Sequence, residues 1–400
     1  MKNLENKAST ESSTMLTPII EAPLNWSADS WQNYTVKQIP KYENHQMNQV
    51  QQQLKEQESL VSLQSIQLLK DKLQNINDSN SFIVQMGECA ETFSQSTKED
   101  ISSRVDFFHK VESLFNHHNI IKIGRIAGQY AKPRSETFEN IDGKEHMVYK
   151  GDMLNNFEHS KSRDIDVTKL LQAYQCSKDS IYYLKQADPS IFTSHEGLIL
   201  PYESALTKQL NNQYFASSAH MLWLGERTRF INSAHIEYLR GIINPIGIKV
   251  SHNVAFDELT NIIKLLNPKN EGGKIILIHR FGVKHIKQYL PILLLNLKKT
   301  SHKVIHMLDV MHGNTMNINN IKTRNMSDMT NELQFFNFII KDNHLKWGGI
   351  HLENTYEDVT ECIDSEITTN KLQHNYKTYC DPRMNHRQTL FFIKNLVQLL

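Results

Sequence analysis

The feature that most constrains the fold of this chain is a regular alternation of short apolar segments with longer amphipathic ones, which begins near residue 80. The apolar segments have the length of buried strands and lie at 81–87, 120–128, 190–196, 220–226, 244–251, 274–282, 303–310 and 347–354. Helical spacing of apolar residues marks the segments 100–118, 255–267, 283–299, 330–342 and 386–400. Alternation of this kind predicts a parallel sheet, and eight units predict an α/β fold of the (β/α)8 TIM-barrel type. An open, doubly wound sheet is the alternative, but no GxGxxG motif follows any of these strands.

The predicted barrel accounts for residues 79–400 as a single domain and leaves two N-terminal parts. Residues 1–20 are polar and rich in Ser and Thr, which predicts a flexible tail. Residues 21–78 contain leucines at helical spacing over 46–76, which predicts a helical extension, broken once, that covers one end of the core or packs on a partner. The long stretch 129–189 is predicted to be an insertion between the second and third strands.

The charge balance and the apolar content exclude several classes of protein. Lys and Arg number 44 against 43 Asp and Glu, so the net charge of +1 argues against a protein that coats nucleic acid or an anionic membrane. The longest apolar run, near 289–295, is too short to span a bilayer, and the N-terminus has no apolar signal segment. Four cysteines without CxxC spacing do not predict a disulfide scaffold or a zinc finger. A cytoplasmic location is therefore expected.

A basic stretch at 122–136 follows the second predicted strand. It contains Lys122, Arg125, Lys132 and Arg134, with no acid until Glu136. One interpretation is a solvated loop; the other is a pocket for phosphate or carboxylate groups.

The ends of the other strands favour the pocket. Active sites of (β/α)8 barrels form at the C-terminal ends of the strands. Polar residues lie within or just beyond the end of each predicted strand: Cys89, Arg125, Glu196, Glu226, Arg227, Lys249, Arg280, His312 and Glu353. In the last strand, alternation places His351 and Glu353 on one face, toward the barrel mouth.

These polar residues divide into two sets by their chemistry. The first is cationic and suits the oxygens of small phosphorylated acids: Arg125, Lys132, Arg134, Arg227, Lys249 and Arg280. The second combines a thiol, an imidazole and two carboxyls, which together suit one divalent metal ion: Cys89, His312, Glu353 and Asp381. The mixed donors leave Mn²⁺, Co²⁺, Fe²⁺ and Zn²⁺ all open.

Long motifs in this chain resemble the class II 3-deoxy-D-arabino-heptulosonate 7-phosphate (DAHP) synthases over about residues 25–400. They are MGECAETF, KIGRIAGQYAKPRSE, YKGDMLN, TSHEGLILPYESALT, LWLGERTR, NPIGIKV, NPKNEGGKIILIHRFG, DVMHGNT, GGIHLE, EDVTEC and CDPRMN, with WSADSW near the N-terminus. The resemblance implies condensation of phosphoenolpyruvate with erythrose 4-phosphate to DAHP and phosphate, the first step of the shikimate pathway. It also implies one divalent cation, with Mn²⁺ or Co²⁺ expected first.

The resemblance also assigns residues to roles. Cys89, His312, Glu353 and Asp381 match the metal ligands. The phosphoenolpyruvate site is matched by Arg125, Glu226, Arg227, Lys249 and Arg280. The erythrose 4-phosphate region is matched by Lys132, Arg134, Ser135 and Glu196. Lys249, Arg125 and Lys132 are the expected catalytic cations, and the metal is expected to polarise the aldehyde while C3 of phosphoenolpyruvate attacks it.

Four segments depart from the family pattern. They are Met86-Gly87-Glu88, Ser251-His252, Val310 and Lys346-Trp347, and none removes an implied ligand. Lys346 is expected to add a cation that alters phosphate preference. The short chain resembles members from secondary metabolism, such as phenazine formation. Cys380 precedes Asp381, so it is expected near Cys89, and a disulfide between the two thiols is hypothesised to switch the enzyme off.

Other readings keep the fold and change the function. One is an enzyme that uses an amino analogue of erythrose 4-phosphate; another is a weakly active binding or regulatory subunit for a pathway enzyme such as chorismate mutase. Retention of both residue sets argues against the second. A homodimer is expected, with the N-terminal helices available for its interface.

Overall fold

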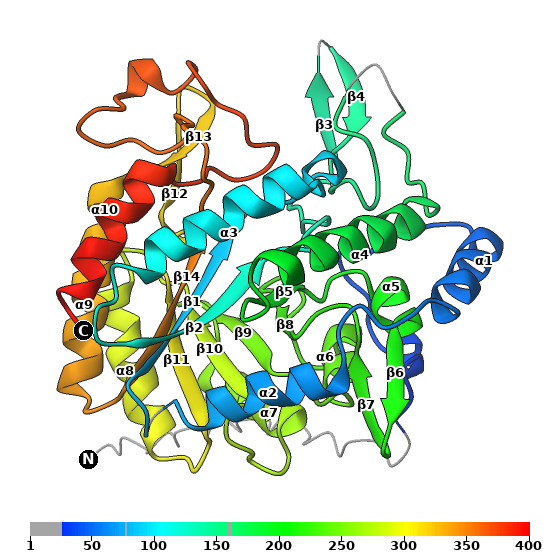
Figure 1. The fold of residues 1–400 in the computed structure, drawn as a ribbon, viewed down its shortest axis with the longest axis horizontal. Helices are drawn as coiled ribbons and strands as arrows, with labels where there is room; N and C mark the ends of the chain where they lie inside the picture. Colours follow the sequence, from blue (N-terminus) through cyan, green and yellow to red (C-terminus); the bar gives the residue numbers. More distant parts are fainter. Residues whose placement is uncertain (1–25, 77, 142, 159–161) are drawn as a thin grey trace, which may run out of the picture.

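The computed structural model describes residues 26–76, 78–141, 143–158 and 162–400, and the predicted tail at 1–20 lies outside them. Parallel strands form a closed barrel in which each strand pairs with the next and the last pairs with the first (Figure 1). In order around the barrel they are β1 (Ser81–Gly87), β2 (Asn119–Arg125), β5 (Phe192–Glu196), β8 (Met221–Leu224), β9 (Ile246–Val250), β10 (Ile275–His279), β11 (Val304–Asp309) and β14 (Trp347–Glu353). The predicted (β/α)8 barrel is confirmed, strand by strand.

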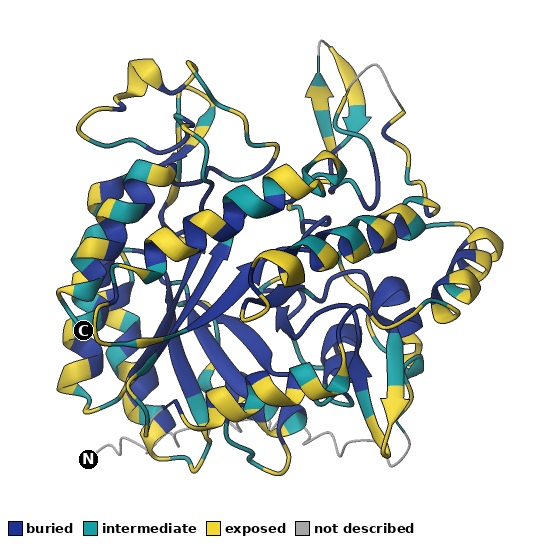
Figure 2. Cartoon of the chain, viewed as in Figure 1, coloured by how far each residue is buried: buried dark blue, intermediate teal, exposed yellow. Residues whose placement is uncertain are grey.

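Helices surround the barrel; most bury one face against it, whereas the short α5 and α6 are buried along their whole length (Figure 2). They are α3 (Lys98–Glu112), α4 (Lys169–Ala187), α5 (Leu200–Ala205), α6 (Ala234–Leu239), α7 (Phe256–Leu266), α8 (Ile286–Lys298), α9 (Met326–Asp342) and α10 (His386–Val397). Side chains of Thr97, Ser233, Asn325 and Asn385 accept backbone N–H bonds at the starts of α3, α6, α9 and α10, which satisfies donors that the helix itself leaves unpaired. All the helices predicted from apolar spacing are present; α3 ends at Glu112, earlier than predicted.

The N-terminal segment supplies a short 3₁₀ helix η1 (Ser30–Asn33), then α1 (Asn44–Lys55) and α2 (Leu63–Gln74), so the helix predicted over 46–76 is indeed broken once. α1 packs against α4 and α5. α2 crosses the N-terminal end of the barrel (Figure 1), where Leu69 and Leu73 join Ile76 against inward-facing strand residues such as Ile83 and Ile121. Apolar contact therefore closes this end of the barrel.

Three β-hairpins interrupt the regular alternation. They are β3 (Phe138–Ile141) with β4 (Lys144–Met147), β6 (Thr207–Leu210) with β7 (Gln213–Ala216), and β12 (Thr315–Ile318) with β13 (Ile321–Arg324). Short 3₁₀ turns η2 (Phe93–Gln95), η3 (His312–Asn314) and η4 (Thr369–Lys371) lie in loops. The predicted insertion at 129–189 was too long. Its last part contains α4, which is the regular crossover helix between β2 and β5.

The prediction for Lys346 is wrong. Lys346 immediately precedes β14 and therefore lies at the N-terminal end of the barrel, away from the mouth. Its ammonium donates to the carbonyls of Ile76 (2.7 Å) and Ser79 (2.5 Å), and so fixes the chain between α2 and β1. Among the helices of the described residues, none has the length and apolar character needed to cross a membrane.

Candidate active site

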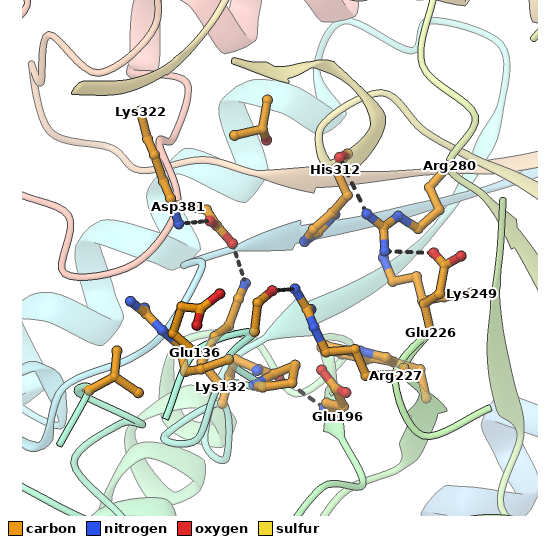
Figure 3. Close-up of a pocket in the computed structure, with 18 of the residues that line it drawn as sticks. Lys132, Glu136, Glu196, Glu226, Arg227, Lys249, Arg280, His312, Lys322 and Asp381 are labelled. Atoms are coloured by element: carbon orange, nitrogen blue, oxygen red, sulfur yellow. Dashed lines mark hydrogen bonds and ion pairs between the residues drawn. The ribbon is translucent and has the colours of Figure 1, made fainter. Parts of the chain in front are cut away.

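A cavity of about 450 Å³ opens at the C-terminal end of the barrel (Figure 3). Most of the residues predicted from the sequence line it: Arg125, Lys132, Arg134, Ser135, Glu196, Glu226, Arg227, Lys249, Arg280, His312 and Asp381. Cys89 and Glu353 are fully buried beside it. Because every barrel strand ends here, residues far apart in the sequence meet in one cavity.

The four predicted metal ligands form a cluster at one side of this cavity. Ligand atoms of Cys89, Glu353 and Asp381 all lie within 4.8 Å of one another. His312 joins through its Nε2, which is 3.0 Å from Glu353 Oε1. The other ring nitrogen of His312, Nδ1, is 2.7 Å from Asp309 Oδ2, so Nε2 is the ring nitrogen that faces the cluster.

The Lys132 ammonium lies within this cluster. Its Nζ is 3.0 Å from Cys89 Sγ, 2.8 Å from Glu353 Oε1 and 3.3 Å from Asp381 Oδ2. Burial disfavours its charge, but these three neighbours raise the pKa of Lys132 above its ordinary value. The site thus stabilises a positive charge, and its thiol, imidazole and carboxyl donors fit a divalent metal of the Mn²⁺, Co²⁺, Fe²⁺ or Zn²⁺ type.

Glu353 is anionic despite complete burial. Burial by itself would raise its pKa, but His312, Lys132 and Arg324 hold the pKa of this carboxyl well below its usual range. Arg324 Nη2 donates to Glu353 Oε2 (2.8 Å), and Arg125 Nη2 donates to Oε1 (3.1 Å). The Cys89 thiol behaves oppositely, because burial, together with Cys380 and Glu353, raises its pKa.

A second part of the cavity carries Arg227, Lys249 and Arg280, each held by an acid or a hydroxyl (Figure 3). Lys249 Nζ is 2.5 Å from Asp309 Oδ2, and Arg280 Nη1 is 2.8 Å from Glu226 Oε2. Burial and the nearby Arg125 outweigh Asp309 and lower the pKa of Lys249 to about 8. Lys249 can therefore change its charge close to neutral pH.

Arg125 is fixed more tightly than a simple substrate contact requires. Its Nε donates to the carbonyl of Glu88 (2.8 Å), and its Nη1 donates to Nε2 of His351 (2.9 Å). His351 in turn donates from Nδ1 to Gln85 (2.7 Å), which defines a neutral imidazole, and burial keeps its pKa well below normal. The Cζ atom of the Arg125 guanidinium lies 4.9 Å from the centre of the Trp223 ring. Arg125 thus presents only part of its donor set to the cavity.

Glu196 differs from the other acids of the cavity, because its buried Oε1 has no hydrogen-bond partner among the described residues. Burial raises the pKa of this carboxyl, although Lys132 and Lys249 oppose the effect. Its backbone N–H is held by the side chain of Gln129 (2.9 Å). A substrate could therefore bind Glu196 Oε1 without breaking an existing hydrogen bond of that oxygen.

Of the four cations in the basic stretch, Lys122 does not enter the cavity. It points outward from β2 and pairs with Asp188 (2.7 Å) and Glu112 (2.8 Å), between α3 and α4. Lys132 and Arg134 line the cavity together with Arg125. The solvated-loop interpretation fails for these three, and the anion-pocket interpretation fails for Lys122.

Comparisons with known proteins agree with this geometry. A model of the class-II DAHP synthetase family matches residues 26–190 and 185–395. This chain belongs to the class-II DAHP synthetase family.

Similar proteins cover nearly the whole chain. Phospho-2-dehydro-3-deoxyheptonate aldolase of Neurospora crassa is 33% identical over 91% of this chain and 92% of its own length. The enzyme of the same name from Streptomyces coelicolor is 30% identical over 91% and 95%, respectively. A solved structure from Francisella tularensis, also titled phospho-2-dehydro-3-deoxyheptonate aldolase, is 16% identical with a TM-score of 0.55 over 91% of this chain and 97% of its own, which shows a shared fold.

Several buried residues that organise the site were not predicted from the sequence. The Glu91 carboxylate accepts the backbone N–H groups of Ala127, Gly128 and Gln129 (3.0–3.1 Å) and so shapes the loop that carries Lys132. Arg383 forms a two-pronged ion pair with Glu361, which also accepts backbone N–H groups at 377, 378 and 383 around Asp381. The sequence could have pointed to these residues, since Glu91, Glu361 and Arg383 lie inside the quoted family motifs.

The departures from the family pattern fall into two groups. Val310 is buried in the apolar core. Ser251 contacts the lining of the cavity, because its hydroxyl donates to Glu226. Cys380 packs in a small cluster with Cys89, as expected, and both thiols are free.

Proposed function

We propose that this chain is a DAHP synthase, which condenses phosphoenolpyruvate with erythrose 4-phosphate, releases phosphate, and so opens the shikimate pathway. The observation that carries the proposal is one cavity that brings a mixed-donor cluster together with six cations of the predicted substrate sites: Arg125, Lys132, Arg134, Arg227, Lys249 and Arg280. Family membership supports the same reaction.

The residues of the cavity fall into two groups by position, and we assign each group to one substrate. Arg280 and Lys249 are paired with Glu226 and Asp309, and we assign them, with Arg125 and Arg227, to the phosphate and carboxylate of phosphoenolpyruvate. Lys132, Arg134 and Ser135 lie in the loop after β2, and Glu196 ends β5; we assign these four to erythrose 4-phosphate. Holding both substrates in register is mainly proximity catalysis. Lys249, with its pKa of about 8, is suited to exchange a proton during the reaction.

Cys89, His312, Glu353 and Asp381 would hold one divalent metal ion, Mn²⁺ or Co²⁺ first and Fe²⁺ or Zn²⁺ as alternatives. When bound, it would supply Lewis acidity toward the aldehyde of erythrose 4-phosphate. Lys132 is placed to balance the negative charge of the same cluster.

The test is turnover measured as loss of the ultraviolet absorbance of phosphoenolpyruvate, with erythrose 4-phosphate present. The protein is stripped with a chelator and then assayed with Mn²⁺ or Co²⁺ restored. Metal-dependent loss that is absent in Cys89→Ala supports the proposal. Folded protein that shows no turnover with any of the four metals would overturn it, and the amino analogue of erythrose 4-phosphate would then be assayed.

The biological setting of the enzyme stays a prediction. A role in secondary metabolism, a homodimer and a chorismate mutase partner all belong here. Size-exclusion chromatography with light scattering, alone and with a chorismate mutase added, tests the last two.

A further inference from the structure

The N-terminal arm, residues 34–40, is fastened to a loop of the candidate active site. Thr35 bridges to Ser233: its N–H donates to the carbonyl of Asn232 (3.1 Å), and its own carbonyl accepts from Ala234 N–H (3.0 Å). Two residues later, the Lys37 ammonium lies 4.1 Å from the centre of the Phe230 ring. Both contacts are to the loop between β8 and α6, which carries Arg227.

At Gln38 the arm turns toward a second loop of the site. Its backbone has a φ of +70°, a conformation that residues other than glycine seldom adopt. This turn allows its side-chain oxygen to accept the backbone N–H of Arg134 at 2.9 Å. Arg134 lies two residues beyond Lys132 and immediately before Ser135, in the loop between β2 and β3.

The same two loops meet inside the cavity, where Arg227 Nη2 donates to the Ser135 hydroxyl at 2.6 Å. The two loops are therefore joined twice. Inside the cavity they are joined by the contact of Arg227 with Ser135, both proposed to bind substrate, and outside it by the N-terminal arm, which contacts both loops. On its other side, the loop is held by the backbone bond from Lys132 N–H to the carbonyl of Lys150 (2.8 Å). The Gln38 bond fixes the half of the loop that carries Arg134 and Ser135.

We infer that Gln38 is a positioning residue for the subsite that binds the phosphorylated aldehyde, an inference that rests on the proposed function. Gln38 does not touch the reacting atoms; it sets the place of Arg134 and Ser135. The residues assigned to phosphoenolpyruvate on β9 and after β10, Lys249 and Arg280, are supported by their own acids. Loss of the Gln38 bond therefore weakens binding of erythrose 4-phosphate most, and it reaches phosphoenolpyruvate only through the contact of Arg227 with Ser135.

The kinetic test uses two substitutions of similar size at Gln38. Gln38→Met keeps the length of the side chain and removes the acceptor, whereas Gln38→Glu keeps an acceptor oxygen. Gln38→Met is expected to raise KM for erythrose 4-phosphate about threefold to tenfold, the usual cost of one hydrogen bond, with KM for phosphoenolpyruvate changed by no more than about twofold. Gln38→Glu stays within twofold of the wild type. Gln32→Ala, an exposed position in η1, is the control for damage to the N-terminal segment as such.

Hydrogen–deuterium exchange separates this inference from the proposed function, because it needs no turnover. The peptide that contains Arg134 should exchange faster in Gln38→Met and at the wild-type rate in Gln38→Glu and Gln32→Ala. Unchanged exchange in Gln38→Met, or an equal rise of both KM values, overturns the inference. If the wild type turns over no substrate, the proposed function fails, and the exchange result still decides whether Gln38 holds the loop.

Discussion

The two ends of the barrel use the same strands and differ in nearly every side chain that points inward. At the N-terminal end, β1 and β10 contribute Ile83 and Ile276, which meet the apolar face of α2. Further along the barrel strands, the inward residues become Lys249, Asp309 and Glu353. The inward-facing positions of the same strands are therefore apolar at one end of the barrel and charged at the other, and those named here are buried at both.

The difference separates stability from chemistry. Apolar area buried at the closed end stabilises the fold by about 25 cal/mol per Å². Buried ion pairs at the open end recover little more than their desolvation cost, so they are weak evidence for stability. We expect substitutions at the open end to damage activity first and those at the closed end to damage stability alone.

The largest expected effect is at the open end. Glu353→Gln removes the charge that Lys132, Arg125 and Arg324 all approach. Turnover should fall at least about a hundredfold, because Glu353 is itself a proposed metal ligand and loss of a residue that only supports a ligand already costs about tenfold to a hundredfold; bound metal measured by mass spectrometry should fall with it. Glu366→Gln, at an exposed ion pair, is the control. A Glu353→Gln enzyme that keeps a tenth or more of wild-type turnover would contradict the assignment of chemistry to the open end.

Next is a substitution at the closed end. Leu69→Ala, at a fully buried position of α2, should lower the free energy of unfolding by about 2–5 kcal/mol, measured in urea. Leu68→Ala on the same helix is the matched control, because that side chain is 52% exposed and should change stability by no more than about 0.5 kcal/mol. Both KM values should stay at the wild-type level. A changed KM in Leu69→Ala would show that the ends are coupled.

The open end should also respond to pH in a way that the closed end does not. Lys249 has a pKa lowered to about 8, so its cation is present below that pH and is lost above it. The ratio kcat/KM for phosphoenolpyruvate should therefore fall above pH 8, approaching tenfold per pH unit. Lys249→Arg stays charged, and its remaining activity should lack this fall. An identical fall in Lys249→Arg would assign it to another group.

The smallest expected effect concerns Ser251, one of the departures from the family pattern named in the sequence analysis. Ser251→Gly removes the hydroxyl that donates to Glu226 and leaves that acid to hold Arg280 more firmly. KM for phosphoenolpyruvate should rise about twofold to tenfold. Ser251→Ala should match it, since only the hydroxyl matters; a normal Ser251→Ala would instead point to the backbone.

Local patterns predicted the barrel because strand and helix periodicities are properties of short segments. The same reasoning predicted which residues would meet at the mouth, since strand ends converge in this fold. It failed for Lys346, whose side of the barrel depends on where β14 begins. It also failed to find Gln38, because a bond that spans 96 positions in the chain leaves no local trace.

The pairing of β1 with β14 sets a condition on how the chain can be made. The 265 residues between Ser81 and Trp347 must be synthesised before the ring of strands can close, which takes roughly 10–50 s at ordinary translation rates. Throughout that interval β1 has an unpaired edge, and the leucines of α2 have no complete barrel end to pack against. Nascent chains should therefore recruit chaperones early, and truncation anywhere before β14 should yield aggregates.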